Sequence, residues 1–231
     1  MTGRAPMAQL PDAVTFDCYG TLIDWETGLE RSLLWILREK PDPPGLDKVV
    51  EAWGLHERAL TSGKEGYRRY REVIADALRL AFEDLEVAYT PRDGHRLAEG
   101  MGKWEPFDDV PGALAQLRDV GFKLGVLSNT DDDILAQSLR SIGVPFDVAV
   151  TAEQVKAYKP DARVFEVGLD RLKLKPEQVL HVSFSPYHDL ERAKALGFRT
   201  FWVDRHHQGE TEVDVDLIGR DLRALVATLL G

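Results

Sequence analysis

Polar side chains that could do chemistry follow short apolar runs at four places along the chain. They are Asp17 and Thr21, then Ser128 and Asn129, then Lys159, and finally Ser183, Ser185 and Asp189. A carboxylate can act as a nucleophile when a nearby cation keeps it ionised and hydrogen-bond donors hold it and its substrate. Parallel strands would gather these residues at one edge of a sheet. The set therefore fits nucleophilic chemistry by an aspartate.

Asp17 is the first candidate, because it follows a β-branched and aromatic run near the start of the chain. Val14 and Phe16 suit a buried parallel strand, and Gly20 lets the backbone turn sharply without Cβ strain. Open α/β sheets bind ligands outside the carboxyl ends of their strands. On turn preferences alone, Asp17 could equally start a turn or cap a helix.

The other three groups also have structural interpretations when each is taken singly. Ser128 and Asn129 could form a turn or a helix cap, and Lys159 could lie in a solvated loop before Pro160. Asp189 could be only the N-cap of the next helix. Four such groups in order, each at a predicted strand end, indicate a site more strongly than any one of them.

The segment Phe16–Leu22, Phe-Asp-Cys-Tyr-Gly-Thr-Leu, resembles the first motif of the haloacid dehalogenase (HAD) superfamily. Hydrolases of that superfamily use an aspartate at this point as a nucleophile. The second, third and fourth motifs of the superfamily resemble Leu127–Asn129, Lys159–Asp161 and Val182–Asp189. The resemblance spans the whole predicted core and implies a hydrolase.

Two positions within these motifs resemble the type II 2-haloacid dehalogenases more than the phosphatases of the superfamily. Phosphatases usually carry a second Asp as proton donor where this chain has Tyr19, and a phenol with a pKa near 10 is a poor general acid. Phosphatases also hold Mg²⁺ with an acid where this chain has Phe184, which cannot bind a metal. The resemblance therefore implies attack on carbon without a metal or another cofactor.

The resemblance also implies a role for each candidate residue. Asp17 would displace halide from C2 of a small 2-haloacid, and water would then hydrolyse the resulting ester. Lys159 would keep Asp17 anionic, and Asp189 would orient or activate the water. The substrate site would comprise Thr21, Ser128 and Asn129 as donors, Tyr19 as an apolar wall, and Ser183 and Ser185 as the matches to the Ser and Asn of the fourth motif.

Departures from the dehalogenase pattern leave the substrate open. The arginine that these enzymes carry near the halide has no counterpart in register within Ala52–Glu57, although Arg58 or Arg68 could reach the site. A pocket tyrosine after the third-motif lysine corresponds to Phe165 here. The fourth motif is one residue longer and has Ser185 instead of Asn.

Two other functions stay open. One is a Mg²⁺-dependent phosphatase of a small phosphorylated metabolite, in which Asp189, with Glu191, still recruits the metal. The other is a non-catalytic binding protein that keeps the fold without the metal chemistry.

Short apolar strands alternate with helices in the second half of the chain. The predicted strands are Lys123–Leu127, Val148–Thr151, Val179–Val182 and Thr200–Val203, and the predicted helices are Gly112–Val120, Asp133–Ile142, Ala162–Leu172 and Asp189–Leu196. This alternation predicts an α/β fold with a doubly wound, Rossmann-like parallel sheet.

Between the first strand and this region the pattern is helical throughout. The predicted helices are Trp25–Lys40, Leu46–Leu60, Tyr67–Leu85 and a shorter one around Asp93–Lys103. We therefore expect an all-helical cap domain of residues 25–103, inserted into a core of residues 1–24 and 104–231. The aromatic candidates for the pocket face of this cap, or for packing between its helices, are Trp25, Trp53, Tyr67, Tyr70 and Trp104.

Composition excludes several other classes of protein. The chain has 231 residues, a formal net charge of −10 and no extended basic patch, which argues against nucleic-acid binding. No stretch approaches the roughly 20 apolar residues of a membrane span. The single cysteine, Cys18, allows no internal disulfide and suits the cytoplasm. We expect a soluble cytoplasmic enzyme with a small anionic substrate, and a homodimer would be unsurprising. His181 and His188 are expected to be structural.

Overall fold

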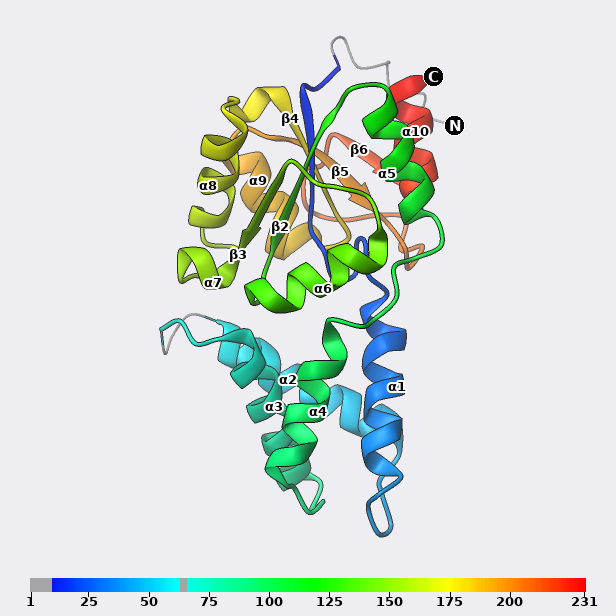
Figure 1. The fold of residues 1–231 in the computed structure, drawn as a ribbon, viewed down its shortest axis with the longest axis vertical. Helices are drawn as coiled ribbons and strands as arrows, with labels where there is room; N and C mark the ends of the chain where they lie inside the picture. The colour runs from blue at the N-terminus through cyan, green and yellow to red at the C-terminus, as the bar shows by residue number, and fades with distance from the viewer. Residues whose placement is uncertain (1–9, 63–65) are drawn as a thin grey trace.

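The structure, a computed structural model that describes residues 10–62 and 66–231 apart from the His188 side chain, centres on a six-stranded parallel sheet (Figure 1). The strands are β1 (Ala13–Phe16), β2 (Lys123–Ser128), β3 (Val148–Thr151), β4 (Val179–Ser183), β5 (Arg199–Val203) and β6 (Leu217–Gly219). Their order across the sheet is β3-β2-β1-β4-β5-β6, and every neighbouring pair is parallel. Phe16 pairs with Val126 on one side and Val182 on the other, so the residues after β1 emerge between the ends of β2 and β4.

Helices cover both faces of the sheet. They are α5 (Val110–Asp119), α6 (Asp132–Ile142), α7 (Ala152–Val155), α8 (Arg163–Leu172), α9 (Glu191–Ala195) and α10 (Leu222–Leu230), with short helical turns η1 (Pro176–Gln178) and η2 (Pro186–Leu190). Buried apolar residues fill the space between these helices and the sheet. One cluster includes residues of α5, α6 and α10 and continues into residues 25–101, a second includes residues of α8 and α9, and a third consists of Leu190, Trp202 and Val215. Burial on both faces explains why the strands read as continuous apolar runs.

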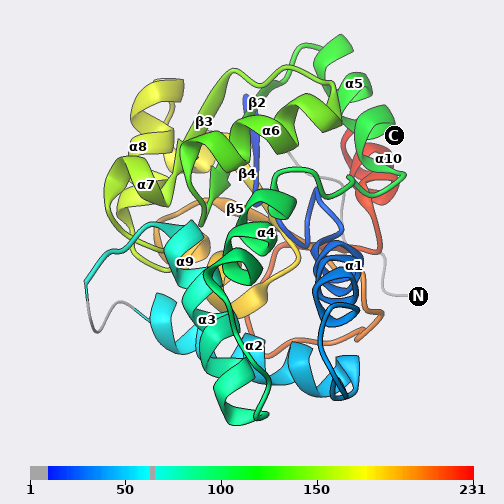
Figure 2. The same ribbon diagram turned by 60° about the horizontal axis from the view of Figure 1, so that its bottom comes forward.

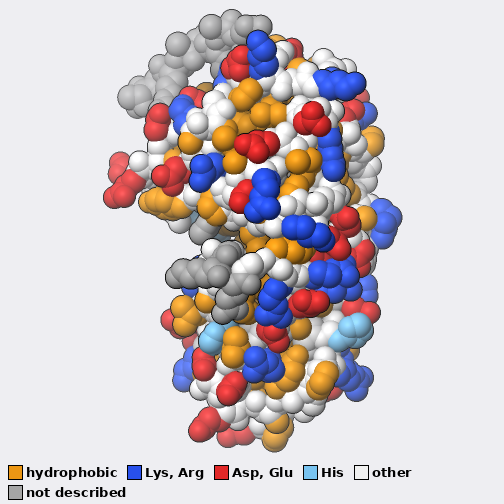
Figure 3. Space-filling model, turned by 90° about the vertical axis from the view of Figure 1, so that its left-hand side faces the viewer, with side chains coloured by type: hydrophobic (Ala, Val, Ile, Leu, Met, Phe, Trp, Pro, Cys, Tyr) orange, Lys and Arg blue, Asp and Glu red, His pale blue; other side chains and the backbone are white. Residues whose placement is uncertain are grey.

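Four helices form a separate group beyond the carboxyl ends of the strands, which we call the helical lobe (Figures 1 and 2). They are α1 (Trp25–Leu37), α2 (Leu46–Thr61), α3 (Tyr70–Asp84) and α4 (Pro91–Met101). Figure 3 shows an indentation on one side of the molecule, where this lobe meets the sheet-containing lobe. The assignment of residues 25–103 to a cap domain stays a prediction.

The α/β fold and the order of its elements agree with the prediction from the sequence. The predicted helix Asp189–Leu196 differs, because the chain first makes the wide turn η2 and α9 begins only at Glu191. Helix α7, strand β6 and helix α10 were not predicted. In the described part of the chain, no helix has the length and apolar character needed to cross a membrane.

Candidate active site

Asp17 lies directly after β1, in the middle of the sheet edge that faces the helical lobe. Its backbone N–H donates to the Val182 carbonyl at 3.0 Å and so extends the pairing with β4. The carboxylate is buried, with Oδ1 accepting from Lys159 Nζ at 2.8 Å and Oδ2 accepting from the Thr21 hydroxyl at 3.0 Å. Because both oxygens have donors, the orientation of the carboxylate is set before any substrate binds.

The turn after Asp17 connects this carboxylate to the end of β4. Gly20 has a φ of +94°, which favours glycine, and a Cβ there would lie 2.5 Å from a ring carbon of Phe184. The Thr21 hydroxyl donates to Asp17 and accepts from the backbone N–H of Phe184 at 3.0 Å. Thr21 therefore holds the carboxylate and the fourth motif together.

Lys159 is the cation of the site, and its ammonium group is almost fully buried. Nζ donates to Asp17 at 2.8 Å, to Asp189 Oδ2 at 2.6 Å and to the Leu127 carbonyl at 2.9 Å. Asn129 holds the lysine from behind, since its Oδ1 accepts from the Lys159 backbone N–H at 2.6 Å and its Nδ2 donates to the Lys159 carbonyl at 3.2 Å. The observed contacts of Asn129 are therefore with the lysine loop.

Asp189 lies in η2 and shares the Lys159 ammonium group with Asp17. Its Oδ2 accepts from Lys159 and from the Ser183 hydroxyl at 3.1 Å, and its Oδ1 is 2.9 Å from His181 Nε2. Ser183 Oγ also accepts from the Ser185 backbone N–H at 3.1 Å. The structure thus brings the fourth-motif serines and Asp189 together, with Ser183 supporting the carboxylate.

His181 contacts the predicted site residue Asp189, although we expected from the sequence that this histidine is only structural. It lies two residues before Ser183 on β4, and its Nδ1 is 2.9 Å from the hydroxyl of Thr15 on β1. Side chains two residues apart on a strand share a face of the sheet, so this spacing was a usable signal. The sequence alone did not show that Asp189 folds back onto that face.

Burial and neighbouring charges have opposing effects on the pKa values of Asp17, Asp189 and Lys159. Burial raises the pKa of the Asp17 carboxyl above its ordinary value, and the charge of Lys159 opposes that rise. Burial also disfavours the ionised form of Asp189, but Lys159 outweighs it and holds the pKa of that carboxyl well below its usual range. The two carboxylates raise the pKa of Lys159 despite its burial. The lysine is therefore charged at neutral pH.

The hydroxyl of Tyr19 is directed toward helix α6. It is 2.8 Å from Ser138 Oγ on that helix, and the Tyr19 ring meets that of Trp104 edge to face. Burial raises the pKa of the phenol well above its ordinary value. These contacts suit a wall of the site rather than a general acid.

A cavity of about 870 Å³ opens above these residues, between the sheet edge and the helical lobe. The predicted site residues that line it are Asp17, Tyr19, Ser128, Asn129, Lys159, Ser185 and Asp189, whereas Thr21 and Ser183 lie behind its wall. All five aromatic candidates, Trp25, Trp53, Tyr67, Tyr70 and Trp104, also line it. The Ser128 hydroxyl is buried and has no hydrogen-bond partner among residues 10–62 and 66–231.

The two arginines considered for the helical lobe differ in position. Arg58 lines the cavity, and its guanidinium lies over Gly54, one helical turn earlier. Arg68 is not part of the lining and pairs with Asp76. Phe165 is also absent from the lining, because it is fully buried below the sheet edge.

A model of the haloacid dehalogenase-like hydrolase family matches residues 11–197, which include all four motifs of the site. The chain belongs to this family.

Proteins that are similar to this chain in sequence and in structure support the same family assignment. The chain is 28% identical over 209 residues to haloacetate dehalogenase H-2 of Moraxella sp. (strain B), covering 84% of this chain and 86% of the relative. A crystal structure of an L-2-haloacid dehalogenase superposes with a TM-score of 0.84 at 26% identity, covering 96% of this chain and all of that one. A phosphoserine phosphatase of Thermus thermophilus is 27% identical over 206 residues, covering 86% of this chain and 75% of the relative.

The oxygen atoms at the site of this hydrolase do not form a suitable set of ligands for a resident Mg²⁺ ion. Each oxygen of Asp17 and Asp189 already accepts a hydrogen bond, and Phe184 is the residue after Ser183, where an acid would be needed. A hard cation needs several oxygen ligands. In the described part of the chain, no group of three or more His, Cys, Asp or Glu side chains could hold a metal ion.

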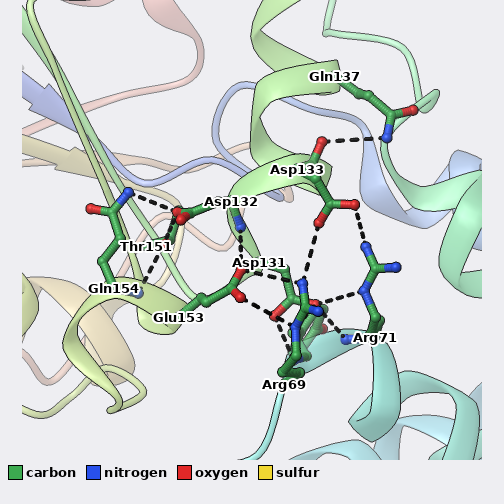
Figure 4. Close-up of polar contacts among 10 residues, drawn as sticks. Arg69, Arg71, Asp131, Asp132, Asp133, Gln137, Thr151, Glu153 and Gln154 are labelled. Atoms are coloured by element: carbon green, nitrogen blue, oxygen red, sulfur yellow. Dashed lines mark hydrogen bonds and ion pairs between the residues drawn. The ribbon is translucent and has the colours of Figure 1, made fainter.

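A cluster of charged residues joins the helical lobe to the sheet-containing lobe of this hydrolase, beside the cavity (Figure 4). Asp131 precedes α6, yet its buried carboxylate does not cap that helix. It accepts instead from the backbone N–H groups of Tyr70 and Arg71 at the start of α3, at 2.9 and 3.1 Å. Arg71 also pairs with Asp131 and Asp133, and Arg69 with Glu153. Asp131 therefore caps a helix of the other lobe and fixes Tyr70 in the cavity wall.

Replacing Asp131 with Ala should lower the free energy of unfolding by about 3 kcal/mol, because it leaves buried N–H groups and an arginine without their acceptor. Asp133→Ala is the matched control, since it removes an ion pair with the same Arg71 from a side chain that is 55% exposed. That change should cost about 1 kcal/mol or less. Urea unfolding of both variants checks this, and equal losses would contradict the capping role.

Proposed function

We propose that this chain is a metal-independent hydrolase that cleaves the carbon–halogen bond of a small 2-haloacid through an ester on Asp17. The observation that carries the proposal is the pairing of buried Asp17 with Lys159 at the floor of a cavity. In addition, the Tyr19 hydroxyl is hydrogen-bonded to Ser138, and position 184 is occupied by phenylalanine where a phosphatase has an acidic residue. The relatives named above as dehalogenases support the same class of substrate.

In the first step a carboxylate oxygen of Asp17 attacks C2 of the haloacid. A carbon–oxygen bond forms as the carbon–halogen bond breaks, and the halide leaves with the bonding electron pair. Lys159 keeps Asp17 ionised in a buried setting that would otherwise favour protonation. No proton transfer to the leaving group is needed, which agrees with the position of Tyr19.

In the second step water attacks the Asp17 carbonyl carbon of the ester. Asp189 is the carboxylate available to orient this water, because it lines the cavity beside Lys159. The bond between the ester oxygen and the aspartyl carbon breaks, the leaving oxygen takes up one proton of the attacking water, and the product is a 2-hydroxyacid. One water is consumed, and one proton and one halide are released.

Donors at the sheet edge are placed to bind the substrate carboxylate. The buried Ser128 hydroxyl lines the cavity and has no partner among the described residues, so a substrate oxygen would satisfy it. Asn129 retains one amide hydrogen beyond its bond to Lys159, which can be offered to the same oxygen. This orientation would place C2 against Asp17.

The alternative is a phosphatase, which the similarity to phosphoserine phosphatase favours. It would need a metal where the carboxylate oxygens already have donors, and a proton donor where Tyr19 is bonded to Ser138. Glu191, which could have added a ligand, is exposed at the start of α9.

Halide release by chelator-treated protein tests the proposal. We expect chloride from one enantiomer of 2-chloropropionate without added metal, and no phosphate from a panel of phosphate esters. The same assays with added Mg²⁺ are the control. Phosphate released only with Mg²⁺ would support the phosphatase, and no product from any substrate would favour a binding protein. A single turnover in water enriched in oxygen-18 should label Asp17.

A further inference from the structure

His181 is a buried titratable residue outside the cavity that the proposed reaction does not yet use. It is fully buried on β4 and lies between Thr15 on β1 and Asp189 in η2. Its Nδ1 is 2.9 Å from Thr15 Oγ1, and its Nε2 is 2.9 Å from Asp189 Oδ1. It is not among the residues that line the cavity, so any effect on substrate must pass through Asp189.

The hydrogen-bond partners assign a direction to this chain of contacts. An ionised carboxylate can only accept, so Nε2 carries the hydrogen that is donated to Asp189. In the neutral ring Nδ1 is then an acceptor, and the Thr15 hydroxyl can donate to it. Each polar atom of the buried series Thr15, His181 and Asp189 thus has a partner.

The imidazole ring is also held in its plane by packing. The rings of Phe165 and Phe198 meet it edge to face, with centroids 5.3 and 6.2 Å away. A ring fixed in this way keeps Oδ1 of Asp189 at the back of the site. Oδ2 is then directed toward Lys159 and Ser183, at the side of the cavity.

We propose that His181 is a positioning residue for the hydrolytic step, which orients Asp189 toward the water that attacks the Asp17 ester. This inference rests on the proposed function. The first step depends on Asp17 and Lys159, and Lys159 keeps its bonds to Asp17 and to the Leu127 carbonyl without His181. Loss of His181 should therefore slow hydrolysis more than formation of the ester.

Rapid-quench kinetics with 2-chloropropionate separate these two steps. In His181→Leu we expect a burst of up to one chloride per active site, followed by slower steady-state turnover. Turnover should be about 10- to 100-fold slower than in the wild type, the range found when a residue that orients a metal-binding side chain is replaced. Intact-protein mass spectrometry of the quenched variant should show the ester on Asp17. His181→Gln, which can place an N–H near the position of Nε2, should restore most of the turnover and lose the ester.

Thr15→Val tests the same series of contacts with a smaller change, should His181→Leu fail to fold. It removes only the far hydrogen bond and should give a smaller accumulation of ester. Thr200→Val is the matched control, because Thr200 is a buried threonine on β5 that pairs with His181 in the sheet but bonds to Asp216. It should accumulate no ester.

The outcomes distinguish this inference from the proposed function. If wild-type protein releases chloride but His181→Leu slows the burst and the steady state equally, without ester, then His181 is only structural and the inference is wrong. Unchanged turnover in His181→Leu would also overturn it. If wild-type protein releases no chloride from either enantiomer, then the proposed function fails, and the inference fails with it.

Discussion

Replacing Asp17 with Asn should reduce chloride release from 2-chloropropionate by about 10⁴-fold or more, because the amide cannot supply the anionic oxygen that forms the ester. The side chain keeps its size and can still accept from Thr21. Stability should therefore change much less than activity. Chloride release and thermal unfolding, measured on the same preparation, check both parts.

Asp12→Asn is the matched control for this change. Asp12 directly precedes β1 and Asp17 directly follows it, so the two carboxylates flank the same strand at opposite ends. Asp12 is exposed, and its carboxylate accepts from Gln178, far from the cavity lining. Activity in Asp12→Asn should match the wild type. Full activity in Asp17→Asn would exclude the covalent mechanism.

Replacing Lys159 with Met should lower activity by about 10²- to 10³-fold and the free energy of unfolding at neutral pH by about 3 to 5 kcal/mol. Lys159 is the shared partner of two buried carboxylates, and without it Asp17 and Asp189 face each other with no opposite charge. Lys48→Met, an exposed lysine on α2, should change stability by no more than about 0.5 kcal/mol.

The stability that Lys159→Met loses should depend on pH, with the larger loss at higher pH. Without the cation, burial and mutual repulsion raise the pKa values of the two carboxyl groups in the folded state. A group whose pKa is raised by folding destabilises the protein as pH rises through that value. The stability deficit should therefore be smaller at about pH 5 than at about pH 8. A deficit independent of pH would contradict the pairing.

The pH profile of activity should also change in the Lys159→Met variant, by a shift to higher pH. In the wild type, burial raises the pKa of Asp17 and Lys159 opposes that rise. Activity should fall as the pH is lowered through this pKa, since only the ionised form attacks. In Lys159→Met the midpoint of this acid limb should lie at higher pH, because the opposing charge is gone. Steady-state rates across pH measure both midpoints.

Local patterns predicted most of the sheet and helices, because burial of parallel strands on both faces leaves continuous apolar runs in the sequence. Two of the exceptions lie at the end of the chain. Strand β6 is three residues long and partly exposed, so it has no such run. Helix α10 follows an acidic segment, although its residues Leu222, Leu225, Val226 and Leu229 are buried at helical spacing and could have been recognised.

Sequence patterns were sufficient to predict which polar residues meet, because parallel strands place their carboxyl ends at one edge of the sheet whatever the helices do. Asp17, Ser128, Lys159 and Asp189 were predicted together on that ground, and all four line the cavity. The individual contacts of each group depend on how distant segments pack, and they could be read only from the folded chain. Asp189 reaches His181 because η2 folds back onto β4, and Asn129 holds the loop of Lys159.

At the junction of the two lobes, too, sequence patterns did not predict the contacts between distant segments. Asp131 precedes one helix, and sequence rules would have it cap that helix, but it caps α3, sixty residues earlier in the chain. Local propensity describes how a residue interacts with its neighbours along the chain. A hydrogen bond between distant segments depends on how the helical lobe packs against the sheet, and no short stretch of sequence contains that information.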